Sequence, residues 1–220
     1  MPREEHFPTE FGPISIVYRD EYFLVADKPA GMLSVPGRGP DKQDCLINRL
    51  LVDYPNAKTV HRLDMATSGL LIFALSYESQ KALGRLFEKR LVDKEYQAVV
   101  HGLIENDEGK IDLPLICDWP NRPRQKVCYE HGKPSQTEYR VLHRDTDKKC
   151  TRVALHPITG RSHQLRVHMQ ALGHPILGDF FYADDDAFAA ASRLCLHAHK
   201  LNFRHPFTDE EVSVASEAAF

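Results

Sequence analysis

The segment GLLIFALS, residues 69–76, is a nearly continuous apolar run, and it constrains the fold more than any other part of the chain. A run of this length is typical of a strand that is buried at the centre of a sheet. The segment YESQKALGRLFEKRL, residues 77–91, follows directly. Its apolar positions Leu83, Leu86 and Phe87 predict an amphipathic helix packed against that sheet.

Short alternating segments joined by turns make up much of the remaining chain. Two strands are predicted at 14–18 and 22–28, and a hairpin at 136–144 and 151–157. Repeated βαβ units are absent, so the pattern predicts an α+β fold with a mixed, mostly antiparallel sheet of about eight strands and three helices. The expected helix caps are Asp41 or Asp44 before a helix ending near Asp53, and Ser162 before SHQLRVHMQALG.

The composition is that of an ordinary globular protein: 42% of the 220 residues are hydrophobic and 27% are charged. Residues 1–13 are interpreted as a flexible polar leader, and residues 14–220 as a single domain. If that domain has two lobes, the long insertion at 105–135 is their expected boundary. No apolar run approaches the length of a membrane span, and the N-terminus lacks a signal peptide core. We therefore expect a cytoplasmic protein with reduced cysteines.

Positive charge is concentrated in one part of this acidic chain. Residues 119–166 contain 11 lysines and arginines against 4 acidic residues, although the whole chain has a net charge of −3. This distribution is compatible with a surface that binds nucleic acid. The alternative is that these charges are spread over a solvated face without a partner.

The segment HRLDMATSG, residues 61–69, holds a lone carboxylate, Asp64, close to Arg62. No second acid lies nearby, which argues against the paired carboxylates of common glycosidases. A lone aspartate can act as a covalent nucleophile, and a neighbouring arginine keeps it ionised. A tight turn over Thr67, Ser68 and Gly69 could bring the segment against a ligand. The alternative is an ordinary surface Arg–Asp pair.

Arg166 lies in a predicted helix that is largely buried, so it needs a carboxylate partner. Asp64 is one candidate, and a structural salt bridge elsewhere in the interior is the alternative. Tyr96 opens the alternating strand EYQAVV; it is either a core residue or a flat surface on which a base stacks. The imidazoles of His197 and His199 share a strand face, but no acidic third ligand is evident. We therefore expect no metal site. No phosphate-binding glycine loop is present, so a nucleotide cofactor is not expected either.

Four ordered motifs together resemble the RluA-type pseudouridine synthases. HRLDMATSG is similar to the catalytic motif of that family, and DKPAGMLSVPG to its N-terminal motif. KEYQAVV and TGRSHQLRVHMQALGHPILGD are similar to its two later motifs, so the resemblance covers residues 14–206. LPLICDWPNRPRQKVCYEHGKP, residues 113–134, resembles the family members that act on both 23S ribosomal RNA and transfer RNA.

The resemblance implies an isomerase that converts uridine to pseudouridine in RNA without a cofactor or metal. It implies a sheet in two halves with the active site in a cleft between them. Several family members carry an S4-type RNA-binding domain before the catalytic domain, and we expect none in this chain. Asp64 would be the nucleophile, Tyr96 would stack on the flipped uracil, and Arg166 would pair with Asp64. Three first steps for Asp64 agree with the resemblance: attack on C6 of the uracil, attack on C1′ of the ribose, and deprotonation of the sugar.

The remaining predicted residues would contact the RNA, with Arg62 next to the flipped nucleotide. They are His61, Arg62, Thr67, Arg122, Arg124, Lys126, Arg161 and His163. We expect a monomer that needs no protein partner and no membrane. Two other hypotheses remain: a non-catalytic RNA-binding module with the same basic surface, and a metal-dependent hydrolase built around His197 and His199.

Overall fold

The computed structural model describes residues 10–220, and most of the predicted leader lies outside this range. The described chain forms two compact units. The N-terminal unit contains residues 10–94 and His197–Ala219, and the central unit contains Glu95–Leu196 with Phe220. The expectation that the insertion at 105–135 separates two lobes is wrong, because the boundaries fall after Lys94 and after Leu196.

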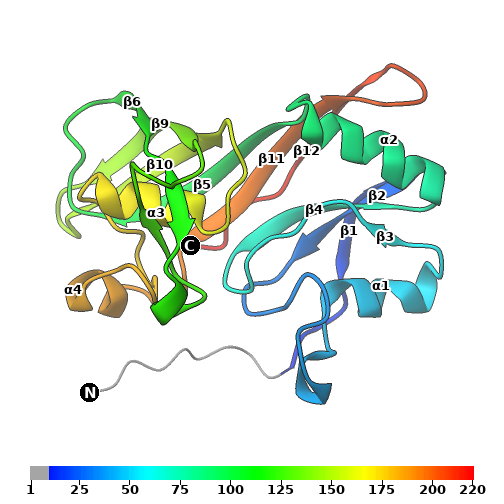
Figure 1. Cartoon of the computed structure of the whole chain (residues 1–220), viewed down its shortest axis with the longest axis horizontal. Coiled ribbons are helices and arrows are strands. Elements are labelled where there is room, and N and C mark those ends of the chain that lie inside the picture. The colour runs from blue at the N-terminus through cyan, green and yellow to red at the C-terminus, as the bar shows by residue number, and fades with distance from the viewer. Residues whose placement is uncertain (1–9) are drawn as a thin grey trace. The chain divides into compact units, whose positions relative to one another are not determined.

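The N-terminal unit is built on a mixed sheet (Figure 1). The hydrogen-bonded order is β1 (Ser15–Arg19), β2 (Phe23–Lys28), β4 (Ser68–Ala74), β11 (Leu196–Arg204) and β12 (Glu211–Ala215). The pair β4–β11 is parallel and the other pairs are antiparallel. A two-residue strand, β3 (Lys58–Thr59), also pairs with β4.

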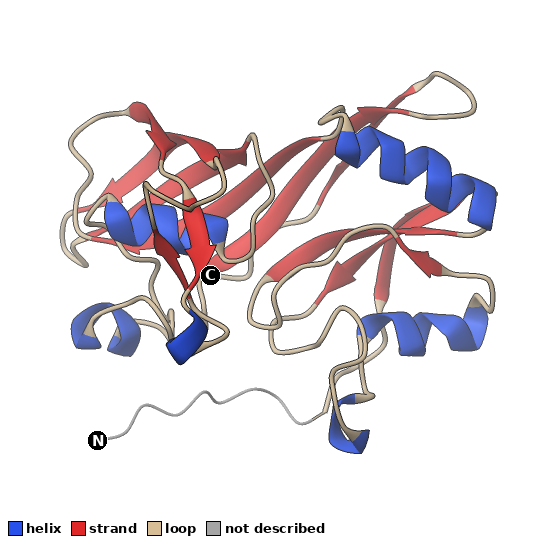
Figure 2. Ribbon diagram, viewed as in Figure 1, coloured by secondary structure: helices blue, strands red, loops and turns tan. Residues whose placement is uncertain are grey.

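Strand β4 is buried along its whole length, as the apolar run predicts. Helices α1 (Leu46–Asp53) and α2 (Tyr77–Glu88) lie on opposite sides of the strands, which explains burial on both faces (Figure 2). Leu83 of α2 belongs to the same buried cluster as Leu70 and Ile72 of β4. The prediction of a central strand followed by an amphipathic helix is therefore confirmed.

The predicted cap of α1 is wrong. Cys45 is the N-cap residue and no side chain caps this helix. The carboxylate of Asp44 instead accepts hydrogen bonds from Arg49, at 2.6 and 2.8 Å. Asp44 therefore lies before the N-cap position, and its carboxylate is held by the Arg49 side chain instead.

The central unit contains a second set of antiparallel strands. Its order is β5 (Asp93–His101), β10 (Cys150–Pro157), β9 (Gln136–Asp145) and β6 (Glu108–Asp112). Strands β7 (Leu115–Cys117) and β8 (Gln125–Val127) form a separate hairpin. Helices α3 (Gln164–Ala171) and α4 (Asp185–Ala189) complete the unit.

The α+β class and the β9–β10 hairpin are confirmed, but the described chain contains twelve strands where about eight were expected. The insertion holds three strands, β6, β7 and β8, where one was expected. Two of them have only three residues, too short for an alternating pattern to stand out. Within residues 10–220, no helix is long and apolar enough to cross a bilayer.

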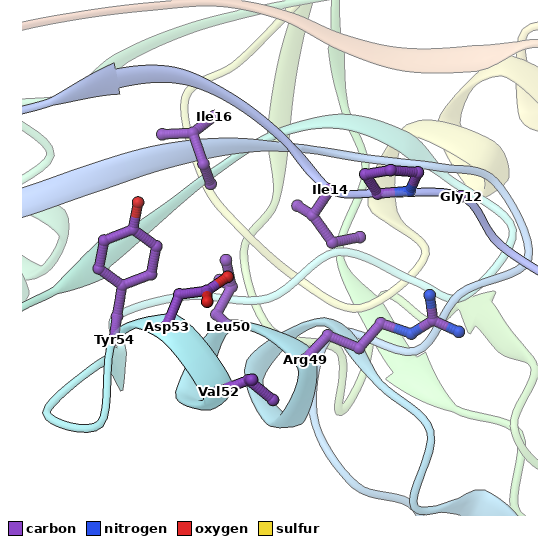
Figure 3. Close-up of a pocket in the computed structure, with 9 residues that line it drawn as sticks. Gly12, Ile14, Ile16, Arg49, Leu50, Val52, Asp53 and Tyr54 are labelled. Carbon is purple, nitrogen blue, oxygen red and sulfur yellow. The ribbon is translucent and has the colours of Figure 1, made fainter.

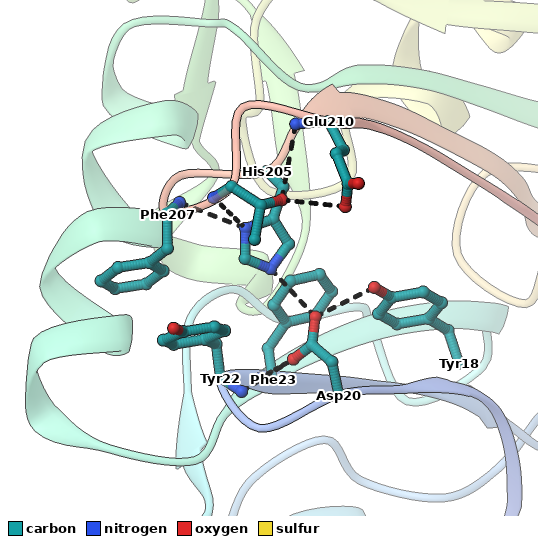
Figure 4. Close-up of polar contacts among 8 residues, drawn as sticks. Tyr18, Asp20, Tyr22, Phe23, His205, Phe207 and Glu210 are labelled. Carbon is teal, nitrogen blue, oxygen red and sulfur yellow. Dashed lines mark hydrogen bonds and ion pairs between the residues drawn. The ribbon is translucent and has the colours of Figure 1, made fainter.

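A partly buried polar network joins two turns of the N-terminal unit through Asp20 (Figure 4). One carboxylate oxygen of Asp20 accepts from the amides of Tyr22 and Phe23, at 2.7 and 2.8 Å. The other accepts from the Tyr18 hydroxyl and from Nε2 of His205, both at 2.9 Å. Burial and the neighbouring Asp20 carboxylate raise the pKa of Tyr18 to about 12, so its hydroxyl remains a donor.

The imidazole of His205 is held as one tautomer. Its Nδ1 accepts from the amides of Phe207 and Thr208, at 3.1 and 3.0 Å. The proton of the neutral ring is therefore on Nε2, which donates it to Asp20. Through this ring, the turn between β1 and β2 is tied to the turn between β11 and β12.

The Asp20 network makes stability dependent on acid pH. Burial by itself would raise the pKa of Asp20, but its hydrogen bonds outweigh burial and hold the pKa below the ordinary value of 3.8. The stabilisation is therefore present above that value, and it is lost as the pH falls through the lowered pKa. We expect the urea midpoint of the wild type to decrease below about pH 4, and that of Asp20→Asn to decrease less.

The matched control is Asp53→Asn, which changes an exposed carboxylate at the end of α1. Its midpoint should follow the wild-type pH dependence. If Asp20→Asn also follows the wild-type curve between pH 6 and 2, the network does not carry this linkage.

Candidate functional site

Asp64 lies between β3 and β4, at the first position of a tight turn. The Thr67 amide closes this turn by donating to the Asp64 carbonyl oxygen at 3.1 Å. Arg62 is exposed and Asp64 is partly exposed, whereas Leu63 between them is buried. This alternation places both charged side chains on the outer face, as expected for residues two apart in extended chain.

The backbone on the N-terminal side of Asp64 is held by Ser34. The buried Ser34 hydroxyl donates to the Leu63 carbonyl oxygen at 2.8 Å and accepts from the Leu63 amide at 3.1 Å. Both backbone polar groups of Leu63 are thus satisfied by one side chain, 29 positions away in the chain. Leaving such buried groups unpaired would cost about 1–3 kcal/mol each.

Lys28 holds the backbone on the other side of Asp64. Its side chain is completely buried, and its ammonium donates to the carbonyl oxygens of Pro29, Met32 and Met65, at 2.9, 2.8 and 3.0 Å. These three acceptors use all three donors of the ammonium. The Gly31 amide also donates to Met65, at 2.9 Å. The carboxylate of Asp64 therefore projects from a backbone that is fixed on both sides.

The predicted tight turn over Thr67, Ser68 and Gly69 is wrong, because Ser68 and Gly69 belong to β4. Gly69 has a φ of 112°, and a Cβ atom there would lie 2.4 Å from the Ala198 carbonyl oxygen. The glycine is thus required by the close approach of β11 rather than by a ligand. The Thr67 side chain is 2% exposed and belongs to the interior.

His61 supports the edge of β4. Its Nε2 accepts from the Ile72 amide at 3.0 Å, and its ring stacks on Phe87 at 4.4 Å between centroids. Burial and the positive charge of Lys94 lower the pKa of His61 to about 3. The ring is therefore neutral at physiological pH and supplies no positive charge for a phosphate.

In the central unit, Arg166 forms a bidentate ion pair with Asp179. The donor atoms Nε and Nη2 lie 2.7 and 2.6 Å from the two carboxylate oxygens. Both side chains are buried, with 2% and 0% of their surface exposed. Sequence reasoning correctly required an acid for this buried arginine, but it missed Asp179, which closes the motif at 159–179. The predicted pair between Arg166 and Asp64 joins residues of the two units and stays a prediction.

Asp179 also organises the aromatic residues that follow it. Its carboxylate accepts from the amides of Phe181 and Tyr182, at 2.9 and 3.1 Å. The Arg166 guanidinium lies 5.3 and 5.2 Å from the centroids of the same two rings. Cation–π contacts of this kind fix the plane of the guanidinium in addition to the ion pair.

His163 is the N-cap of α3 and adopts a left-handed φ of 53°, so the prediction that Ser162 caps this helix is wrong. No side chain caps this helix; the Gln164 side-chain oxygen instead accepts from the Arg161 amide at 3.0 Å and from the Thr159 hydroxyl at 2.7 Å, in the turn before it. His163 Nδ1 lies 2.7 Å from the Tyr182 hydroxyl. The start of α3 is therefore joined to the aromatic residues around Arg166.

The predicted RNA-contacting cations of the central unit are exposed. Arg122, Arg124 and Lys126 lie on or beside the β7–β8 hairpin. Nε of Arg161 donates to the Pro134 carbonyl oxygen, at 3.3 Å, just beyond this hairpin. The fold thus brings Arg161 to the segment that follows the hairpin, from a distant part of the sequence.

Tyr96 lies in β5 opposite Leu155 of β10 and is partly exposed. It is therefore not a fully buried core residue, which was the main alternative to a stacking role. A partly exposed ring on a paired strand has a fixed backbone and a limited choice of rotamers. This arrangement suits a flat contact surface for a base.

His197 and His199 are occupied by hydrogen bonds within the N-terminal unit. His197 Nδ1 lies 2.9 Å from the Ser68 hydroxyl, and its Nε2 lies 3.1 Å from the Ser216 carbonyl oxygen. Nδ1 of His199 lies 2.6 Å from the same carbonyl oxygen. Among residues 10–220, no group of three histidine, cysteine or acidic side chains is placed to hold a metal ion.

A pocket of about 350 Å³ lies between α1 and the chain that leads into β1 (Figure 3). Its lining includes Ile14, Ile16, Leu50 and Val52, and it contains none of the predicted site residues. Arg49 at this pocket is already engaged by Asp44.

Comparison with known proteins agrees with the motifs. Residues 22–171 match the sequence profile of the RNA pseudouridylate synthase family. The chain is 56% identical over 205 residues to the dual-specificity RNA pseudouridine synthase RluA of Yersinia pestis, covering 93% of this chain and 99% of the relative. It is 51% identical to the protein of the same name from Escherichia coli strain K12, over 100% of both chains.

A similar solved structure also belongs to a protein named for an RNA pseudouridylate synthase domain. Human RNA Pseudouridylate Synthase Domain Containing 1 is 32% identical and superposes with a TM-score of 0.80, covering 96% of this chain and 86% of the human chain. The match in fold therefore accompanies the match in sequence over nearly the whole length. The chain belongs to the RNA pseudouridylate synthase family, the isomerases that convert uridine into pseudouridine within RNA.

Proposed function

We propose that this enzyme modifies uridines in two RNA classes, 23S ribosomal RNA and the anticodon arm of transfer RNA. The observation that carries the proposal is the identity of 51–56%, over nearly the full chain, to relatives named dual-specificity synthases. The resemblance of residues 113–134 to such family members also supports it. The enzyme would act as a monomer in the cytoplasm, where both RNA classes are found.

Asp64 is proposed as the nucleophile of the reaction. Ser34 and Lys28 immobilise the backbone on both sides of it, while its own side chain remains partly exposed. A catalytic group gains most from such fixation, because its orientation is set before the substrate arrives. The N1 glycosidic bond breaks, the uracil rotates, and C5 bonds to the same sugar carbon; C5 then loses its proton and N1 gains one. The departing base is also the returning one, so a second carboxylate is not needed.

The other proposed roles follow from the chemistry of the flipped base. Extracting the target uridine from its stack costs a few kcal/mol, least in a loop. Tyr96 would stack on the extracted uracil, and the exposed Arg62 would occupy the space that the nucleotide leaves. Arg166 would stabilise the ionised form of Asp64. The His61 ring is neutral and Thr67 is buried. Both residues would support the Asp64 turn.

The dual specificity can be tested with pseudouridine mapping in cells that have or lack this protein. We expect uridines in both a transfer RNA anticodon arm and 23S ribosomal RNA to lose modification together. Purified enzyme should restore both in unmodified transcripts. Loss in only one RNA class, with no activity on the other transcript, would refute the dual proposal while leaving the family assignment intact.

A further inference from the structure

The only tryptophan of the chain, Trp119, lies on the surface with 65% of its side chain exposed. Tryptophan is highly buried on average, so this degree of exposure requires an explanation. Trp119 begins a short 3-10 turn, Trp119–Asn121, between β7 and β8. Trp119 belongs to neither the buried cluster around Leu70 and Leu83 nor the one around Leu115 and Val167, so packing in these clusters does not explain its position.

The turn that carries Trp119 is held firmly. The Asp118 carbonyl oxygen accepts from the Asn121 amide at 2.9 Å, and the Asp118 amide donates to the Arg124 carbonyl oxygen at 2.9 Å. The side chains of Asp118 and Asn121 are joined at 2.8 Å. Pro120 further restricts the backbone. The backbone that carries the exposed ring is therefore fixed before any partner binds.

The β7–β8 hairpin packs against the part of the central unit that contains Arg166. The Gln125 amide donates to the Tyr182 hydroxyl at 2.7 Å. Leu115 of β7 and Val127 of β8 pack with Val167 of α3 in one apolar cluster. A ligand that contacts the hairpin would thus be held in a fixed relation to α3.

The surroundings of Trp119 are cationic. The Arg122 guanidinium lies 4.5 Å from the centre of the Trp119 ring. Residues 115–134 contain four lysines and arginines but only two acidic residues. A second exposed aromatic, Tyr129, is 79% exposed in the same segment. Flat aromatic surfaces among cations are the combination that binds single-stranded nucleic acid, by stacking of bases and by contact with phosphates.

We propose that Trp119, with Arg122 stacked on it, is a platform for an unpaired base of the substrate RNA other than the target uridine. The proposal rests on the RNA-modifying function of the family. Bases within a duplex already stack on their neighbours, so an unpaired loop base is the group that can reach this ring. The platform would contribute to substrate binding and leave the chemical step unchanged.

The first test uses Trp119 as its own probe, because all tryptophan fluorescence of the protein arises from it. The Asp64→Asn protein is titrated with a fluorescently labelled RNA stem-loop, and anisotropy of the label reports binding. We expect the tryptophan emission to be quenched in step with binding. A fully paired duplex of the same length should quench it much less. Unchanged emission at saturating stem-loop, or equal quenching by the duplex, would overturn the proposal.

The second test measures kinetics of otherwise wild-type enzyme. Trp119→Ala should raise KM for a stem-loop substrate by about 5- to 150-fold, the equivalent of about 1–3 kcal/mol for one stacked base, with kcat within about twofold. Trp119→Phe should recover most of the loss. The matched control is Tyr77→Ala, which removes an aromatic that is 74% exposed in the N-terminal unit and should have no effect.

The outcomes separate this proposal from the broader one. If the wild type modifies the stem-loop but Trp119→Ala keeps its KM, the platform does not bind RNA, and its partner is of another class, such as a protein. A fall in kcat that Trp119→Phe does not reverse would indicate a structural role and also refute the platform. Absence of product with the wild type would instead refute the choice of substrate, while the fluorescence titration would still report on stacking.

Discussion

Replacing Asp64 by asparagine is expected to abolish pseudouridine formation while leaving the fold and RNA binding in place. The two side chains have nearly the same shape, but the amide is not a nucleophile of comparable strength. Removal of a nucleophile in covalent catalysis typically lowers kcat by about 10⁴-fold or more. Turnover of a uridine-containing transcript, measured by release of tritium from C5 or by mapping of the product, would detect this loss.

Two controls make the Asp64 result specific. Asp53→Asn removes an exposed carboxylate of the same unit and should retain full activity. The melting temperature of Asp64→Asn should stay within a few degrees of the wild type, because Lys28 and Ser34 hold the backbone of the turn independently of this side chain. Substantial activity of Asp64→Asn would contradict the assignment of the nucleophile.

Asp179→Asn is expected to produce the largest loss of stability of any conservative substitution considered. The Arg166 side chain is 2% exposed, and the change would replace the charged acceptor of its Nε and Nη2 donors by a neutral amide. Breaking a buried pair by removing one partner costs about 3–5 kcal/mol. Urea denaturation should show a correspondingly lower midpoint, and activity should fall because Arg166 loses its fixed orientation.

The control for this substitution is Asp186→Asn, which changes an exposed acid in α4 and should leave the midpoint unchanged. A double variant, Arg166→Met with Asp179→Leu, removes both charges and should recover much of the stability, but not the activity. If Asp179→Asn is as stable as the wild type, the ion pair does not stabilise this unit.

The sequence was most informative where burial acts on many residues at once. The apolar run at 69–76 predicted β4, because a strand covered on both faces must be apolar at every position. The hairpin β9–β10 and helix α2 were predicted for similar reasons of periodicity. The capping residues were predicted poorly: Asp44 binds Arg49, and His163 rather than Ser162 is the N-cap of α3, which no side chain caps. Such choices depend on which neighbours the fold supplies.

For the functional residues too, some properties follow from the sequence and others only from the tertiary structure. The sequence by itself determined that Asp64 stands without a second acid, and that a buried Arg166 must have a carboxylate partner. Only the tertiary structure identified that partner as Asp179 within the unit, and showed that His61 is a neutral support for β4. It also showed that Lys28, 37 positions from Met65, holds the turn of Asp64. Residue type and local spacing determine what chemistry a side chain can perform, whereas burial and hydrogen-bond partners distant in sequence determine its charge, orientation and exposure.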